Sequence, residues 1–239
     1  MLTTEGTLLD GRVRYRQPTA GYRTGIEPVL LAACVPARRG ERVVEGGAGA
    51  GAGLMCVAAR VPGVRGAAVE LDAGMAMLAR ANFAANGFGE LVAVAGDVTE
   101  TDLGAADHAM ANPPWFSGSG TPSPSPGRQR AKHGAPELTA AWVRALAAGL
   151  RRRGTLTLAL PVAGVPDGLA ALAAAGCGSP ALLPLWPRIG QPAKIVLLQA
   201  SRGGAAAFRL APGLVLHEAD GRYTAAADAI LRGGDALPT

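Results

Sequence analysis

The sequence has few cysteines, few aromatic side chains and no long uninterrupted apolar run. Its three cysteines, Cys34, Cys56 and Cys177, show no metal-ligand spacing. This sparse, odd set excludes a disulfide scaffold and favours reduced core thiols in a cytoplasmic protein. Although 49% of the residues are hydrophobic, 34 glycines and 18 prolines interrupt every apolar run. No run therefore approaches the roughly 18 residues that a membrane span needs, and the first residues lack the pattern of a secretory signal.

Charge and length set broad limits on the partners and on the domain organisation. With 23 basic and 18 acidic residues, the net charge of +5 permits an anionic partner without requiring one. A chain of 239 residues fits one α/β domain. We expect a single domain over 1–239, with a basic and helical extension at 1–40, a core at 41–200 and a second extension, packed on that core, at 201–239.

Strand and helix patterns alternate from residue 41 onward. Strands are predicted at 42–45, 64–71, 91–97, 106–112, 155–161, 181–186 and 193–200. Helices are predicted at 26–35, 53–61, 73–87 and 139–154, and the tail reads as a hairpin followed by a helix at 223–233. In the helix at 139–154, Arg151, Arg152 and Arg153 would occupy the last turn. The alternation predicts an α/β fold, a Rossmann-like doubly wound sheet of about seven mostly parallel strands with the last strand antiparallel.

A glycine-rich loop, "VVEGGAGAGAG", ends the first strand of the predicted core. Gly47, Gly49 and Gly51 would let the backbone turn tightly and approach a ligand. Glu45, two residues before the first of these glycines, helps to fix the register and is a further candidate for a cofactor contact, because an acid at this position recurs in one class of nucleotide-binding proteins. Because glycine is so frequent in this chain, the loop alone is weak support for a nucleotide site.

Two carboxylates strengthen that interpretation. Glu70 ends the next predicted strand, about 20 residues on, where a carboxylate binds both ribose hydroxyls of a nucleotide. Asp97 follows the third strand at the same edge of the sheet, which is where ligands of doubly wound sheets bind. Together these residues predict a bound adenosine cofactor. The glycines leave NAD and S-adenosylmethionine open, because "GAGAGA" also fits the dinucleotide pattern.

The hexapeptide "ANPPWF" at 111–116 decides between the two cofactors. The side-chain oxygen of Asn112 and the carbonyl of Pro113 can accept both N–H groups of a planar amine, which makes its nitrogen a better nucleophile. Pro113 and Pro114 donate no N–H and hold the turn rigid. Trp115 offers a flat face on which a base can stack, worth about 1–3 kcal/mol. This pattern predicts methyl transfer from S-adenosylmethionine, without a metal and without a strong general base.

At this point the sequence resembles a known family. Glu-x-Gly-x-Gly-x-Gly followed by Asn-Pro-Pro-aromatic resembles the class I S-adenosylmethionine-dependent methyltransferases that modify amino groups. The stretch "YRQPTAGYRTGIEPVLLAA" further resembles the bacterial family that methylates the exocyclic amino group of an adenosine in the anticodon loop of valine tRNA. The resemblance covers roughly residues 10–235 of the chain and implies an RNA partner, tRNA in particular, and no DNA.

The resemblance also assigns roles to individual residues. It implies that Gly47, Gly49, Gly51 and Glu70 bind the cofactor, that Asp97 meets its adenine, and that residues 112–115 hold the target amino group. Three positions depart from the family pattern. Trp115 replaces the usual Tyr or Phe, Glu45 stands where Asp is common, and Gly134 stands where an acid often occurs.

Basic residues near these motifs are candidates for substrate contacts. Arg128, Arg130 and Lys132 alternate beside the proposed site and could hold phosphates. His133, in "AKH", is a weaker candidate for a substrate contact, and Arg23 lies in the family-like stretch. Arg12, Arg14 and Arg16 also alternate, would share one face of an extended segment and could likewise hold phosphates.

Other functions stay open at this stage. A protein glutamine methyltransferase acting on a release factor uses the same Asn-Pro-Pro-aromatic motif to bind a planar amide. Such enzymes usually carry a longer helical amino-terminal domain. A guanine of ribosomal RNA or a small molecule is a further candidate acceptor. A cofactor-binding module without catalysis is disfavoured by the intact Asn-Pro-Pro-Trp, and an NAD dehydrogenase by the lack of room for a second catalytic domain. The sequence does not indicate an oligomeric state.

Overall fold

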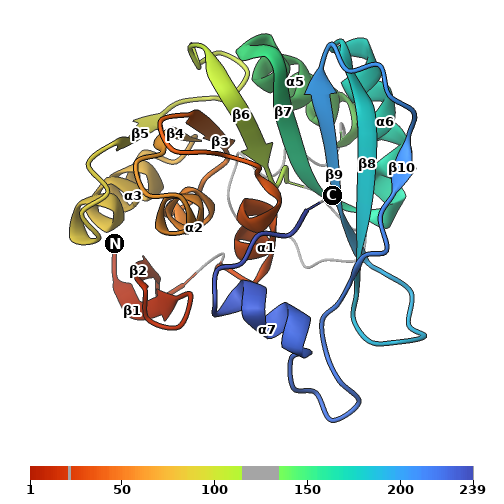
Figure 1. Cartoon of the computed structure of the whole chain (residues 1–239). Helices are drawn as coiled ribbons and strands as arrows, with labels where there is room; N and C mark the ends of the chain where they lie inside the picture. The colour runs from red at the N-terminus through yellow and green to blue at the C-terminus, as the bar shows by residue number, and fades with distance from the viewer. Residues whose placement is uncertain (21–22, 115–134, 239) are drawn as a thin grey trace.

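The computed structural model describes residues 1–20, 23–114 and 135–238, and Figure 1 shows a twisted sheet with helices on both faces. Its strands are β1 (Thr3–Leu8), β2 (Val13–Pro18), β3 (Arg42–Gly46), β4 (Arg65–Glu70), β5 (Leu91–Ala95), β6 (Ala106–Ala111), β7 (Leu150–Pro161), β8 (Cys177–Trp186), β9 (Ile195–Arg202), β10 (Arg209–Leu210) and β11 (Leu214–Val215). Its helices are α1 (Glu27–Cys34), α2 (Ala52–Arg60), α3 (Ala73–Ala85), α5 (Ala135–Ala148), α6 (Val165–Ala174) and α7 (Ala225–Leu231), with the 3₁₀ turn η2 (Val162–Gly164).

The large sheet has the order β10-β8-β9-β7-β6-β3-β4-β5, with β11 also paired to β8. Strands β7, β6, β3, β4 and β5 run parallel to one another, whereas β9 runs antiparallel between β7 and β8. The predicted doubly wound sheet with its last long strand antiparallel is thus confirmed. In the tail, β10 and β11 each pair with β8, and the predicted hairpin is reduced to one antiparallel bridge between His217 and Tyr223.

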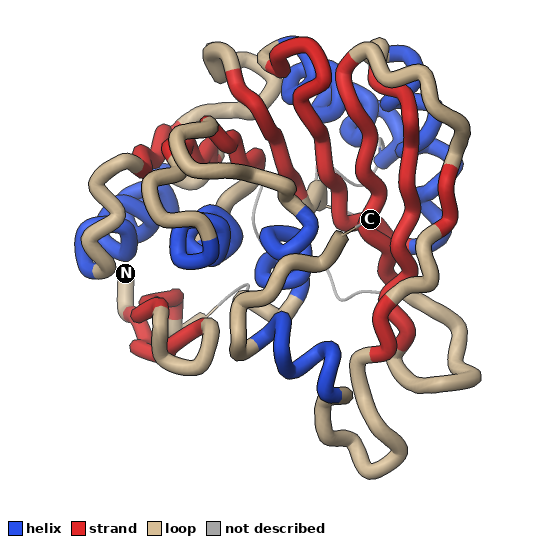
Figure 2. Tube along the Cα trace, in the orientation of Figure 1, coloured by secondary structure: helices blue, strands red, loops and turns tan. Residues whose placement is uncertain are grey.

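The two faces of the sheet are covered by different sets of helices. Helices α1, α2 and α3 contribute to one core cluster and α5 and α6 pack on the other face, as Figure 2 also shows. Strands β3 and β6 are buried at nearly every position, as expected for parallel strands covered on both sides. All three cysteines are buried, and burial raises the pKa of Cys34 and of Cys56 to about 12.

One predicted helix end is wrong. Helix α5 ends at Ala148, and Arg151, Arg152 and Arg153 belong to the start of β7. The register against β6 shifts here from Ala106 opposite Leu150 to His108 opposite Thr155, so the three arginines bulge out of the ladder. Arg153 has a positive φ of 65°, and Arg151 pairs with Asp107 at 2.9 Å. The arginines therefore do not complement the end of a helix.

The amino-terminal hairpin β1–β2 is held to α3 by two asparagines. The main-chain N–H groups of Arg14 and Arg16 donate to the Oδ1 atoms of Asn86 and Asn82 at 2.8 and 3.0 Å. The carboxamides donate back to the carbonyls of Arg14 and Arg16 at 2.7 and 2.9 Å. Asn82 lies in the last turn of α3 and Asn86 caps the end of that helix, so the two side chains, four residues apart, face the hairpin together. Asn82 also donates to the carbonyl of Ala50 at 2.9 Å, which links the hairpin to the glycine loop.

Three arginines, Arg12 just before β2 and Arg14 and Arg16 within it, contact other groups of the chain. Arg12 donates to the carbonyls of Ala59 and Gly233, and Arg14 to that of Ala85. Arg16 pairs with Glu5. These residues share an exposed side of the hairpin, as predicted, but their guanidinium groups are engaged within the chain.

Candidate functional site

The loop between β3 and α2 requires glycine at three positions. The φ angles of Gly47, Gly49 and Gly51 are 66°, 57° and 84°, which only glycine adopts without strain. The N–H groups of Gly47 and Ala48 both donate to the carbonyl of Val69, at 2.9 and 3.1 Å. These two bonds draw the loop across the carboxyl end of β4.

The space beside each glycine shows what else the loop accommodates. A Cβ atom on Gly47 would lie 2.6 Å from the Cη2 atom of Trp142, and one on Gly51 would lie 2.5 Å from Phe83. At Gly49 the nearest atom would be the Met75 methyl carbon, at an ordinary 3.7 Å. Gly47 and Gly51 are thus also fixed by packing, whereas Gly49 lies on the least crowded part of the loop.

Glu70 connects the end of β4 to the glycine loop. One carboxylate oxygen accepts the N–H of Gly49 at 2.8 Å, and the other accepts the N–H of Asp72 at 3.0 Å. A carboxylate has about four acceptor positions, so both oxygens can accept further bonds from a pair of hydroxyls. The structure therefore fits the ribose-binding role predicted for Glu70.

Asp97 lies at the end of the neighbouring strand β5. Its Oδ1 atom accepts the N–H and the hydroxyl of Thr99 at 2.8 and 2.7 Å, which forms a tight turn. The N–H of Gly96 donates to the carbonyl of Glu70 at 2.9 Å, so the two strand ends are tied together. Asp97 and Glu70 are thus brought to adjacent positions at one edge of the sheet.

Glu45 is a buried residue within β3. Only 5% of its surface is exposed, and its Oε2 atom accepts the N–H of Leu54 at 2.8 Å, in the first turn of α2. Burial raises the pKa of this carboxyl to about 8. The observed role of Glu45 is to fasten α2 to the sheet, and a cofactor contact stays a prediction.

Asn112 follows directly after β6. Ala111, the last residue of that strand, pairs with Gly46, so Asn112 and Gly47 come next on neighbouring strands. Asn112 is half-buried, Pro113 is buried and Pro114 is exposed. The structure thus brings the Asn-Pro-Pro segment beside the glycine loop. The predicted residues Trp115, Arg128, Arg130, Lys132 and His133 lie outside the described residues.

Arg23 is among the described residues, and its side chain contacts the β1–β2 hairpin. Its guanidinium donates to the hydroxyl of Thr4 at 3.3 Å and to the carbonyl of Pro18 at 3.5 Å. In the described part of the chain these bonds join it to β1 and β2, and a substrate contact stays a prediction.

Two residues of the site were missed by sequence reasoning. Trp142 on α5 reaches Gly47, and Asn82 on α3 reaches Ala50. Trp142 lies four residues before Leu146, a spacing that indicates only a helix face. The scarcity of both residue types was the available signal, because the chain has three Trp and three Asn.

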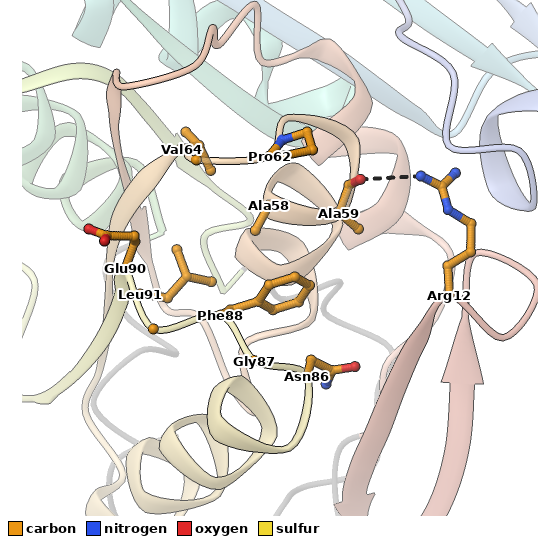
Figure 3. Close-up of a pocket in the computed structure, with 12 residues that line it drawn as sticks. Arg12, Ala58, Ala59, Pro62, Val64, Asn86, Gly87, Phe88, Glu90 and Leu91 are labelled. Carbon is orange, nitrogen blue, oxygen red and sulfur yellow. Dashed lines mark hydrogen bonds between the residues drawn. The ribbon is translucent and has the colours of Figure 1, made fainter.

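A pocket of about 410 Å³ lies at the opposite edge of the sheet, where β4 and β5 begin (Figure 3). Its apolar lining includes Ala58, Val64, Phe88 and Leu91. Arg12 at its rim already donates to the carbonyl of Ala59, at 3.2 Å. Because none of the described residues predicted to bind the cofactor or the acceptor amine lines this pocket, the strand ends at Glu70 and Asn112 are the better candidate site.

Two further findings concern the described residues alone. None of the helices in this part of the chain is long and apolar enough to cross a membrane. A cluster of three or more His, Cys, Asp or Glu side chains arranged to hold a metal ion is also absent from it.

The fold and these strand ends define a class I S-adenosylmethionine-dependent methyltransferase. The model of the methyltransferase small domain family matches residues 26–124. A curated relative from Aeromonas hydrophila, "tRNA1(Val) (adenine(37)-N6)-methyltransferase", is 32% identical over 84% of this chain and 85% of its own length. The chain belongs to the family of this bacterial relative.

Solved structures agree on the fold. The crystal structure of a predicted O-methyltransferase from Agrobacterium tumefaciens is 25% identical, with a TM-score of 0.74 over 89% of this chain and 98% of its own. TrmN from Thermus thermophilus is 21% identical, with a TM-score of 0.56 over 74% of this chain and 47% of its own. S-adenosylmethionine is accordingly the cofactor of this chain.

Proposed function

We propose that the protein transfers the methyl group of S-adenosylmethionine to the exocyclic amino group of an adenine in RNA, in the anticodon loop of a tRNA. The observation that carries this proposal is the position of Asn112-Pro113-Pro114 beside the glycine loop, through the pairing of Ala111 with Gly46. The name of the 32% identical relative supports adenine as the acceptor and tRNA as the substrate.

The order of the strands suggests how the donor lies. Strands β5, β4, β3 and β6 are successive neighbours, and their carboxyl ends carry Asp97, Glu70, Gly47 and Asn112 in that order. Neighbouring strands are about 4.8 Å apart. In our proposal the adenine lies near Asp97, the ribose hydroxyls at Glu70 and the methionine end over Gly47. The transferable methyl group then faces Asn112.

The acceptor amine would be held by the Asn-Pro-Pro segment. When bound, S-adenosylmethionine supplies a methyl group on a positively charged sulfur. The Asn112 side-chain oxygen and the Pro113 carbonyl accept the two N–H bonds of the amine, which increases the electron density on its nitrogen. Pro113 and Pro114 lack N–H groups that could compete. Trp115 would stack on the base, which has left its own stack or comes from a loop.

RNA binding is proposed on the charge and on sequence position. Arg128, Arg130 and Lys132 would contact phosphates next to the target base, with Arg23 and His133 as further substrate contacts. The net charge of +5 is compatible with such a partner. Charge reversal at Arg128 and Arg130 should weaken tRNA binding and flatten its salt dependence while the affinity for S-adenosylmethionine stays the same.

A labelling experiment tests the acceptor. The protein is incubated with S-adenosylmethionine carrying a radioactive methyl group and with either total RNA or total protein from bacterial cells. We expect label in tRNA, recovered as N6-methyladenosine after digestion to nucleosides, and none with the Asn112→Ala variant. Label in methylglutamine would instead identify a release-factor type of methyltransferase, and label in methylguanosine a ribosomal RNA enzyme. Either of these results would overturn the proposal.

A further inference from the structure

We propose that Trp142 forms a wall of the donor site at its sulfonium end and makes the site prefer a cationic ligand over a neutral thioether. The inference rests on the donor placement of the proposed function. It does not depend on whether the acceptor is RNA, because it concerns the affinity for the donor alone.

Helix α5 packs along β3, so that successive turns of the helix cover successive residues at the end of this strand. A Cβ atom on Gly46 would lie 3.4 Å from the Cδ2 atom of Leu146, so Leu146 covers the last residue of that strand. Trp142 lies one helical turn earlier and covers Gly47, the next residue of the chain. Its six-membered ring therefore reaches past the strand and onto the glycine loop.

The burial of Trp142 differs from that of its neighbours on α5. Val143 and Leu146 are buried to 0% and 1% exposure, whereas Trp142 is only half-buried and packs against the edge of the same core. The indole contacts the glycine loop at Gly47, whose φ is 66°. A side chain that served only the core would not need to extend to this loop. The position fits a wall between the core and the ligand site.

The strand order places this wall at the sulfonium. Gly47 lies between Glu70, proposed to bind the ribose, and Asn112, proposed to bind the acceptor amine. The positively charged sulfur of the donor has to lie between these two groups. An indole within about 6 Å of a cation attracts it, by roughly 0.5–2 kcal/mol depending on desolvation. The product S-adenosylhomocysteine has lost this charge together with the methyl group, so the indole would favour the donor over the product.

Equilibrium binding without any acceptor tests the inference. Dissociation constants are measured by calorimetry for S-adenosylmethionine, for sinefungin, whose ammonium stands in place of the sulfonium, and for S-adenosylhomocysteine. Trp142→Leu should weaken the two cationic ligands about tenfold, with S-adenosylhomocysteine within twofold of wild type. Trp142→Phe should recover part of the loss. Trp186→Leu is the matched control, because Trp186 is also half-buried but lies on β8, where it donates to the carbonyl of Pro212 at 3.2 Å.

The outcomes separate this inference from the donor placement. Equal weakening of all three ligands by Trp142→Leu, or no weakening, would overturn the cationic preference. A wild-type protein that binds none of the three would instead contradict the donor placement. If Trp142→Leu does not fold, as judged by thermal unfolding, fluorinated tryptophans are incorporated instead at position 142 of the otherwise wild-type chain. Successive fluorines weaken the attraction of the ring for a cation, so the affinity ratio of S-adenosylmethionine to S-adenosylhomocysteine should fall with each one, and a constant ratio would overturn the inference.

Discussion

The carboxylate of Glu70 accepts the N–H of Gly49 at 2.8 Å, so the acid that ends β4 also holds the loop that follows β3. The proposed ribose contact and the shape of the loop therefore depend on the same side chain. A charged acceptor makes such a bond worth roughly 1.5–3 kcal/mol.

Replacing Glu70 by Gln should accordingly weaken the binding of S-adenosylmethionine by at least tenfold, measured by calorimetry. The substitution removes the negative charge while it keeps the size of the side chain. Glu90→Gln is the control, because Glu90 is exposed at the opposite edge of the sheet. Equal affinities of the Glu70→Gln variant and the wild type would exclude the ribose contact.

Asn112→Ala should abolish methyl transfer and leave the affinity for S-adenosylmethionine within a few-fold of wild type. The side chain is assigned to the acceptor amine and not to the donor. Single-turnover rates and donor affinities, measured on the same preparation, separate the two effects. A parallel loss of both would contradict the assigned role.

The buried carboxyl of Glu45 should make stability depend on pH. Its pKa is raised from 4.5 to about 8 in the folded protein, because burial disfavours the charged form. The stability that the protonated carboxyl contributes is therefore fully present below the unfolded pKa. As the pH rises toward 8, the free energy of unfolding falls by up to about 1.4 kcal/mol per pH unit. Denaturant unfolding is measured from pH 5 to 9. The free energy of unfolding of Glu45→Gln should rise relative to that of the wild type up to about pH 8, and the difference should stay constant above that pH. A difference between the two that does not vary with pH would show that Glu45 is charged in the folded state.

Gly51→Ala should destabilise the protein by several kcal/mol, because two penalties combine. The φ of 84° strains an alanine, and the new methyl group would lie 2.5 Å from Phe83. Gly87→Ala is the matched control, since Gly87 has a φ of 70° but no neighbour within 4 Å of the added atom. It should lose only about 1 kcal/mol. Equal losses in thermal or denaturant unfolding would mean that the packing against Phe83 does not constrain the loop.

Asn82→Ala and Asn86→Ala should both loosen the hairpin, but only Asn82→Ala should reduce donor affinity. Each loses bonds to β2, worth about 1 kcal/mol apiece, and Asn82 alone also bonds Ala50 of the glycine loop. Hydrogen exchange of the hairpin amides and calorimetry with S-adenosylmethionine measure the two effects. A similar affinity loss in both variants would show that the link to Ala50 has no effect on the loop.

Local patterns predicted most of the sheet, and they failed where distant strands decide the outcome. The alternation of apolar segments located β3 to β9, because each strand and helix has its own periodicity. The sequence around Arg151–Arg153, followed by Gly154, has the composition of a helix end, yet pairing of Leu150 with Ala106 starts β7 there. The strand β1 was missed because "TTEGTL" has no apolar alternation and is stabilised by its pairing with β2.

In the site, too, local patterns located some residues, and the packing of distant segments determined the positions of others. Glu70, Asp97 and Asn112 could be placed at one edge because parallel strands align their carboxyl ends. Trp142 could not be placed, because its position depends on how α5 packs against β3. Asn82 and Asn86 read as ordinary helix-surface residues, and their partners are main-chain groups 66 and 72 residues away in sequence.

Asn82 and Asn86 recognise the main chain of the hairpin and not its side chains. Evolution can therefore vary the residues at 14 and 16 with little consequence for this attachment. Proline is the exception, because it would remove the N–H that Asn86 or Asn82 accepts. Among homologues that keep both asparagines, we expect diverse residues but no proline at these two positions.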